Sequence, residues 1–472
     1  MSYLQGRAAS TVTPPIKGRF AASIRTGRAL RFVALASLAG IPLQWFALGS
    51  SPIGELRLHQ LAMFAFTGCI IVYYGLAKVS EGTRRQQFFI LANLYMLVIS
   101  AAMVVYNKGI PIQQSQTLLY IISFAAVSAF FFMAATDPSY NMVDALRWSA
   151  LVTSGVLVLA FAASLLKNGI NPLSVVQQTI ATGDPSILTQ QLFGQAFVGF
   201  GFDLDTTQVQ IRHEVFGGLL LSMYVASWAK ARRPFTEPRQ LAWYRIAMVV
   251  GTLMVLVSLS RALTLAAVLW PAILFLRALL SGRISGGQLT AVLVTVIGSV
   301  GLAVTGFLEV VWDRFAEDTR GYESRSENIT LALERIFDNF WTGGVVTEGT
   351  SSHNFILDNF QRGGVLVGIP TLVVFFYIFG VWTSLLVKIR TMPVELLPVA
   401  AALALPIFRM MTQGGGQISV NGWMTMAFVT GVVFAWRRRE EAAQEEQTAA
   451  RLKSQLVARR PGSGGLMEPI KA

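Results

Sequence analysis

The chain alternates between long apolar stretches and short polar connections over most of its length. Each apolar stretch has about 15–25 residues, which is the length of a helix that crosses a bilayer core about 30 Å thick. Such stretches recur between residues 31 and 436. The pattern therefore predicts an all-α, polytopic integral membrane protein with about 12 transmembrane helices.

Two of the predicted spans are short, and two of the connections are long. Spans 215–229 and 394–408 have only about fifteen residues, so they are tilted, extended into flanking sequence, or re-entrant. The long connections, 167–214 and 310–362, are predicted to be large loops that contain short amphipathic helices. The full set of predicted spans is 31–49, 61–78, 88–106, 117–135, 148–166, 215–229, 241–259, 262–280, 289–309, 363–387, 394–408 and 421–436.

Basic residues fix the predicted orientation, because Lys and Arg concentrate in short cytoplasmic connections. They precede the first span and then recur in alternate connections, which places both termini in the cytoplasm and both long loops on the opposite side. We expect a basic tail over 1–30, a membrane domain over 31–436, and a charged tail over 437–472 that is a solvated helix followed by disorder. The basic residues that carry this pattern are Lys17, Arg19, Arg25, Arg28, Arg84, Arg85, Lys230, Arg232, Arg233, Arg239, Arg283, Lys388, Arg390, Arg437, Arg438 and Arg439.

Composition excludes several other classes of protein. Hydrophobic residues make up 53% of the chain and charged residues 13%, and the mean hydropathy is +0.54, which is too apolar for a water-soluble protein of this length. The net charge of +13 does not indicate nucleic-acid binding, because the basic residues are scattered between apolar stretches rather than gathered on one soluble face. The single cysteine, Cys69, excludes an intramolecular disulfide, and the sequence contains no metal-binding or cofactor motif.

The second long loop contains a predicted surface helix. Ser324 and Glu327 have the spacing of a capping box at a helix start, and an apolar face follows from Ile329 to Phe340. Arg325 lies within this first turn. A helix of this kind is expected to lie at the membrane surface.

His353 is the candidate general base. It is followed by Asn354 near the expected start of a helix, where the positive end of the helix disfavours the imidazolium form and free backbone N–H groups attract anions. The alternative is that His353 caps the helix or hydrogen-bonds in a polar interface. Asp358 lies five residues further on, roughly 140° around a helix axis, so we expect it to be structural rather than to orient the histidine.

Two arginines at the outer ends of predicted spans are candidate phosphate ligands. Ser260 and Arg261 lie in a tight outer hairpin, where Arg261 either snorkels to the interface or binds a phosphate or diphosphate with its planar fork. Arg212, at the outer edge of another span, has the same two possibilities, and it is also placed to pair with Glu214.

These motifs, taken in order, resemble the signature region of the bacterial O-antigen ligase and O-antigen polymerase family. The resemblance covers about residues 250–385, and its most specific element is the His-Asn pair before a glycine-containing apolar span. The residues that carry it are Ser260-Arg261-Ala262-Leu263, Arg325, Trp341, Gly343-Gly344, His353-Asn354, Gly363, Gly364 and Gly368.

The resemblance implies a C-type membrane glycosyltransferase in the bacterial inner membrane, with a periplasmic active site. Its donor would be a glycan linked to undecaprenyl diphosphate, and its acceptor a glycan or lipid A-core, so that the product is lipopolysaccharide or exopolysaccharide. By the resemblance, Arg261 would hold the donor diphosphate and His353 would activate the acceptor hydroxyl. Arg212 and Arg325 would be further diphosphate ligands, and Ser260 and Asn354 would support the site.

Transfer of this kind needs cations at the phosphates and a base for the incoming hydroxyl. We therefore expect a metal-independent, inverting reaction without cofactors. Besides lipid-linked donor, acceptor and membrane lipids, proteins of polysaccharide assembly are compatible partners. Two other classes of protein fit the same pattern: a transporter or flippase of lipid-linked glycans, and a non-catalytic export scaffold that docks through the C-terminal tail. The choice between ligase and polymerase stays open.

Overall fold

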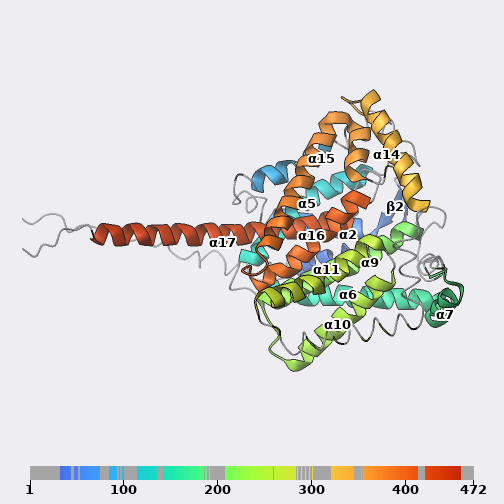
Figure 1. Ribbon diagram of the computed structural model, residues 1–472, viewed down its shortest axis with the longest axis horizontal. Helices are drawn as coiled ribbons and strands as arrows, with labels where there is room; N and C mark the ends of the chain where they lie inside the picture. Colours follow the sequence, from blue (N-terminus) through green and yellow to red (C-terminus); the bar gives the residue numbers. More distant parts are fainter. Residues whose placement is uncertain are drawn as a thin grey trace, which may run out of the picture.

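Helices dominate the described part of the chain, because a backbone segment in lipid must satisfy its own hydrogen bonds. The computed structural model describes residues 32–43, 47–51, 54–74, 84, 86–92, 114–136, 142–184, 208–258, 260–282, 320–344, 352, 354–412 and 420–458, with isolated positions elsewhere. Its elements are β1 (Ala47–Ser51), β2 (Gly54–Arg57), α2 (Leu58–Tyr74), α5 (Gln114–Thr136), α6 (Met142–Lys167), α7 (Pro172–Thr182), α9 (Gln208–Arg232), α10 (Pro238–Val257), α11 (Arg261–Leu280), α14 (Arg320–Asp338), α15 (Phe355–Val387), the 3₁₀ helix η3 (Val394–Leu396), α16 (Leu397–Thr412) and α17 (Val420–Ala458) (Figure 1).

Four helical segments within the described residues are long and apolar enough to cross a membrane: Met142–Lys167, Ala262–Leu280, Phe355–Val387 and Val394–Met411. Leu58–Ile71 and Ser123–Thr136 are shorter apolar helices. These segments support a helical membrane protein, and the total of about a dozen spans stays a prediction. The predicted spans 88–106 and 289–309 are described only in part.

The first predicted span, 31–49, is wrong in its bounds. The described helix there ends at Gly40, and the chain then forms an antiparallel hairpin of β1 and β2, in which Ala47 pairs with Arg57 and Ser51 with Gly54. Pro42 follows the end of the helix, and proline disfavours helical backbone in the residue before it and cannot donate a backbone hydrogen bond.

The main bundle surrounds α16, which contacts α9, α11, α15 and α17; α5 packs along α17, and α6 along α9. At one end of the bundle the Glu395 carboxylate lies 3.5 Å from the Arg232 guanidinium and 3.1 Å from that of Arg439. We call this the basic end. The opposite end, where α9 and α11 begin and α16 ends, is called the site end.

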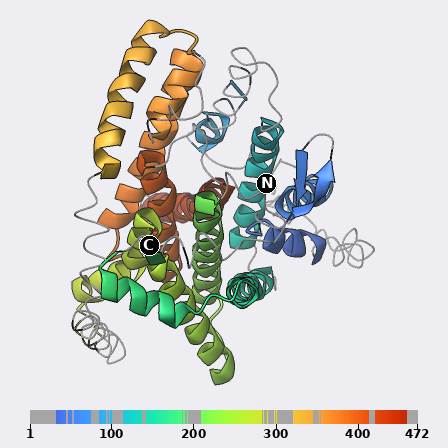
Figure 2. The same cartoon turned by 90° about the vertical axis from the view of Figure 1, so that its right-hand side faces the viewer.

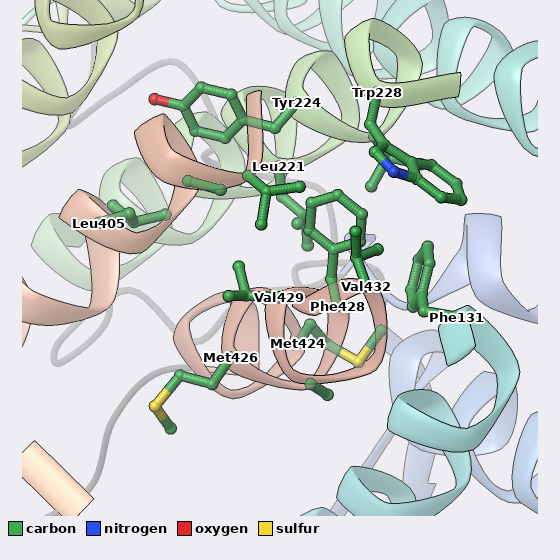
Figure 3. Packing of buried hydrophobic residues seen from close by; sticks show 14 of the residues in the cluster. Phe131, Leu221, Tyr224, Trp228, Leu405, Met424, Met426, Phe428, Val429 and Val432 are labelled. Atoms are coloured by element: carbon green, nitrogen blue, oxygen red, sulfur yellow. The ribbon is translucent and has the colours of Figure 1, made fainter. Parts of the chain in front are cut away.

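Aromatic side chains from three helices interlock in the core (Figure 3). The Phe131 ring of α5 lies edge-on to Phe428 of α17 and to Trp228 of α9, with ring centroids 4.7 Å and 6.1 Å away. Nearby, the Tyr224 hydroxyl of α9 donates to the Ala266 carbonyl oxygen of α11 at 2.7 Å. This bond satisfies a buried hydroxyl and fixes α9 against α11.

One face of α10 is apolar and exposed. Trp243, Ile246, Val249 and Leu253, spaced three or four residues apart, are each more than half exposed. A continuous apolar stripe of this kind on the outside of a bundle is expected where lipid, rather than water, covers the surface.

Several boundaries differ from the prediction. α9 begins at Gln208 and has 25 residues, so the short span 215–229 extends into the expected loop. α14 begins at Arg320, four residues before Ser324, so Ser324 lies inside the helix and is not its cap. α15 begins at Phe355 and shortens the second loop, and α17 continues to Ala458 as a rod beyond the bundle (Figure 1).

Candidate functional site

Two backbone hydrogen bonds join the segment after α14 to the first part of α15. The Gly344 N–H donates to the Gln361 carbonyl oxygen at 2.8 Å, and the Val365 N–H donates to the Phe340 carbonyl oxygen at 2.9 Å. We call the two joined segments, Phe340–Gly344 and Gln361–Val365, the clasp. Figure 2 shows α14 and α15 side by side above the rest of the molecule.

Glycines make the clasp possible. Gly343 has φ +69°, and a Cβ there would lie 2.5 Å from the Arg362 carbonyl carbon; Gly364 has φ +54°, and a Cβ there would lie 2.5 Å from the Phe340 carbonyl oxygen. Both the left-handed backbone and the close approach require residues without a Cβ. This accounts physically for one glycine of each Gly-Gly pair, Gly343 and Gly364.

The clasp coincides with a sharp bend in α15. Gly363 and Gly364 have non-helical backbone angles, and the Phe360 ring lies against Gly368, which in a straight helix would be about 12 Å further along the axis. The first two turns of α15 therefore turn back along the second part of the helix (Figure 1). The predicted span 363–387 begins at this bend.

Asn354 caps the turned-back start of α15. Its side-chain oxygen accepts hydrogen bonds from the backbone N–H groups of Ile356 at 3.0 Å and Leu357 at 3.2 Å. These groups have no partner within the helix, and an asparagine cap typically contributes about 1 kcal/mol. The role of Asn354 that the structure describes is thus to fix the helix start.

Asp358 holds the chain that leads into this cap. Its carboxylate is fully buried and accepts hydrogen bonds from the backbone N–H and the hydroxyl of Ser352, both at 2.7 Å. The Ser352 hydroxyl in turn accepts from the Asn354 N–H at 3.2 Å. Both sequence neighbours of His353 are therefore fixed to the first turn of α15.

The expectation that His353 and Asp358 are separated by 140° around a helix axis does not apply. It assumed that both residues lie on one helix, whereas α15 begins at Phe355, after the Asn354 cap. The Gln361 amide also donates to the Asp358 carboxylate at 3.4 Å, and the Arg362 and Asp358 charges attract each other. Asp358 is thus structural, as expected, but it acts on the segment around position 353.

Ser260 is the cap residue of α11 and is only 2% exposed. Its carbonyl oxygen accepts from the Thr264 N–H at 2.8 Å, and its N–H donates to the Ser258 hydroxyl at 3.4 Å. The tight hairpin predicted between α10 and α11 is therefore held by local serine contacts, which direct the start of α11 at the site end.

For the three arginines predicted to bind phosphate, the structure describes the position of the backbone only. Arg261 is the first residue of α11, Arg212 lies in the second turn of α9, and Arg325 lies in the second turn of α14. Arg261 and Arg212 thus belong to the site end of the bundle, and Arg325 belongs to the helix that packs on α15. His353 lies outside the described residues.

One buried cation at the site end was missed. Arg409 is in the last turn of α16 and is only 3% exposed. The predicted span 394–408 stops one residue before it. An arginine inside the apolar run Ala400–Met411 was the available signal, because buried cations in membrane helices are costly and are usually functional or paired.

The arrangement gathers helix starts and cations at one end of a membrane-type bundle. The starts of α9 and α11 lie at the site end with Arg409, and helix starts favour anions. Within the described residues, no group of three or more His, Cys, Asp or Glu side chains is positioned to hold a metal ion. The fold and its apolar surfaces define a helical membrane protein. No family model matches the sequence, and no curated protein is significantly similar to it.

Proposed function

We propose that this protein transfers a glycan from an undecaprenyl-diphosphate carrier to a sugar hydroxyl, as an O-antigen ligase or a surface polysaccharide polymerase. The observation that supports this most is the bend of α15, because it turns the Asn354 cap, next to His353 in the sequence, back toward the bundle. The first residue of α11, Arg261, begins its helix at the same end of the bundle. A base and a phosphate ligand are the two groups that such a transfer needs.

In the proposed reaction, His353 takes the proton of the acceptor hydroxyl as its oxygen attacks the anomeric carbon of the donor sugar. The bond from that carbon to the diphosphate oxygen breaks, and the electron pair leaves with the diphosphate. Arg261, together with Arg212, balances the developing charge, with a lesser contribution from Arg325. A single displacement inverts the anomeric configuration and needs no metal ion.

Glycan analysis of cells that lack the protein tests this proposal and separates its two forms. Complementation with the wild type should restore surface polysaccharide, and membrane-inserted variants without His353 should not. Single lipid-linked units accumulate if the protein is a polymerase, and long lipid-linked chains accumulate if it is a ligase. Restoration of normal surface glycan by His353→Ala would exclude the proposed chemistry and favour a transporter of lipid-linked glycans.

The projecting part of α17 supports one competing function, that of an export scaffold. Residues 441–455 are exposed throughout and rich in charge, as expected for a docking helix. Deletion of the residues after Arg439 keeps the contact of that arginine with Glu395. This deletion distinguishes a scaffold from a transferase. A scaffold should lose surface polysaccharide on this deletion, and a transferase should retain most of it.

A further inference from the structure

Two cations lie close together where α9 ends and α10 begins, at the basic end of the bundle. Lys230 is in the last turn of α9, and Arg245 is exposed on α10. Their charges repel each other, and among the residues that the structure describes neither forms an ion pair with a carboxylate. Two like charges held side by side in this way favour an anion that comes from outside the protein.

An aromatic contact fixes the position of Lys230. Its ammonium group lies 4.8 Å from the centre of the Tyr244 ring. The Tyr244 hydroxyl shares a 2.7 Å hydrogen bond with the hydroxyl of Ser227, which lies three residues before Lys230 on α9. The ring attracts the charge from one side, whereas an ammonium group has three hydrogen-bond donors. Because Lys230 is partly exposed, donors remain for a ligand from outside the protein.

Other charges near this junction have partners within the protein. The Arg147 guanidinium of α6 lies 3.3 Å from the Asp144 carboxylate, and it donates to the Arg233 carbonyl oxygen at 2.9 Å. Glu237, the acid between α9 and α10, accepts a hydrogen bond from the Gln240 amide at 3.1 Å. The two cations of α9 and α10 thus differ from Arg147, whose charge is balanced by a carboxylate one turn away.

The apolar stripe of α10 leads away from these cations. Arg245 and Val249 are four residues apart and are therefore neighbours on the helix surface, and Leu253 continues the stripe toward the site end. Near the cations Trp243 is 67% exposed, and tryptophan is favoured at the boundary between lipid chains and headgroups. Helical side chains lean toward the helix start, so Arg245 is expected to extend toward the headgroups.

We propose that Lys230 and Arg245 bind the phosphate of an anionic phospholipid whose acyl chains lie along the apolar stripe of α10. Basic pockets between membrane helices are suited to such headgroups, and the exposed stripe matches the chains. A zwitterionic phospholipid carries the same phosphate next to a cation of its own, which the two basic side chains repel. The inference does not depend on the proposed function, because this pair lies at the end of the bundle opposite to Arg261.

Native mass spectrometry of the full chain tests the assignment, with phosphatidylglycerol and phosphatidylcholine of identical acyl chains as probes. We expect the wild type to bind phosphatidylglycerol about tenfold more tightly than phosphatidylcholine. Arg245→Gln should weaken phosphatidylglycerol binding by about tenfold, the effect of one charge-assisted contact. The matched control is Arg437→Gln, which removes one positive charge of α17 at the same end and should stay within about twofold of the wild type. Equal affinities of Arg245→Gln and Arg437→Gln would overturn the assignment.

The second cation is tested by Lys230→Gln, with Lys230→Arg as the variant that keeps the charge. We expect Lys230→Gln to weaken phosphatidylglycerol binding by about tenfold and Lys230→Arg to stay within about threefold of the wild type, because a guanidinium also stacks on an aromatic ring. Wild-type affinity of Lys230→Gln would overturn the assignment. If this variant does not fold, the exposed position of Arg245 keeps the test available.

Glycerol phosphate, a headgroup without acyl chains, distinguishes a bound lipid from a soluble phosphate. We expect glycerol phosphate at the concentration of the lipid to leave phosphatidylglycerol binding unchanged, because it makes no contact with the α10 stripe. Displacement of phosphatidylglycerol by an equal concentration of glycerol phosphate would show that the site takes soluble phosphates, and it would overturn the assignment to a lipid.

Discussion

Gly364→Ala is expected to break the clasp and to unfold the bend of α15. Gly364 has φ +54° and ψ −148°, a backbone region that only glycine commonly occupies. An alanine Cβ at this position would also lie 2.5 Å from the Phe340 carbonyl oxygen and from the Trp341 carbonyl carbon. Either the backbone angles or the close approach of α14 must therefore change.

The backbone strain and the steric contact at position 364 together set how far the free energy of unfolding falls. Holding alanine in the glycine-only region costs about 1–3 kcal/mol, and forcing a methyl group into a backbone contact costs about another 1–3 kcal/mol. The free energy of unfolding should fall by about 2–6 kcal/mol if the bend is kept. If instead the bend relaxes, the hydrogen bonds of Gly344 and Val365 to the opposite segment are lost, and Asn354 moves away from the site end.

Gly380→Ala is the matched control, because Gly380 lies in the same helix and a Cβ there meets nothing within 4 Å. Alanine in a helix interior is favoured over glycine by up to about 1 kcal/mol, so this variant should be as stable as the wild type or slightly more so. Denaturant unfolding in detergent micelles, with glycan transfer measured in parallel, distinguishes the two. Equal stability of Gly364→Ala and Gly380→Ala would refute this reasoning about the clasp.

Three further substitutions test individual contacts. Asp358→Ala should lower the free energy of unfolding by about 1–3 kcal/mol in denaturant, because it leaves the N–H and hydroxyl of Ser352 without their acceptor, and it should also slow transfer. The control Asp338→Ala, in an exposed position, should change neither quantity. An unchanged transfer rate for Asp358→Ala would contradict its positioning role. Glu395→Gln should lower the free energy of unfolding by about 1–2 kcal/mol, because it removes the charged partner of two arginines, and this difference should shrink at high salt. The control Glu441→Gln, on the exposed part of α17, should leave the free energy of unfolding unchanged. Tyr224→Phe should lower the unfolding free energy by about 1 kcal/mol through the lost bond between α9 and α11, and thermal unfolding that matches the wild type would argue against that bond.

Hydrophobic length predicted the helical class of the fold because lipid leaves the backbone few alternatives. It failed where local chemistry intervened. Pro42 follows the end of the first helix inside an apolar run, and β1 and β2 follow where a span was expected. The helix α9 also extends seven residues beyond the apolar window, back to Gln208.

The catalytic and phosphate-binding roles of the site residues stay predictions, and only the motif residue Asn354 has a described contact that bears on the site. Asn354 was selected as part of a motif, and its cap is visible in the structure. The bend of α15 was not predicted, because it depends on pairing Gly343 and Gly364 across about twenty residues of chain. The structural role of Asp358 was predicted, but its contact with Ser352 was not, because this contact runs backwards across the helix start.

Transfer by the purified protein tests the central claim most directly. The measurement compares the wild type, His353→Ala and Arg261→Ala in nanodiscs, with an undecaprenyl-diphosphate-linked glycan and a glycan acceptor. The control is Arg277→Ala, in the last turn of α11 at the basic end, where the Arg277 guanidinium donates to the Met392 carbonyl oxygen at 2.7 Å. We expect that loss of the base lowers the rate by a factor of about 10²–10⁴. Loss of Arg261 should weaken transition-state binding by about 1.5–3 kcal/mol, and the control should retain activity. Wild-type rates from both His353→Ala and Arg261→Ala, in protein that transfers glycan, would contradict the account.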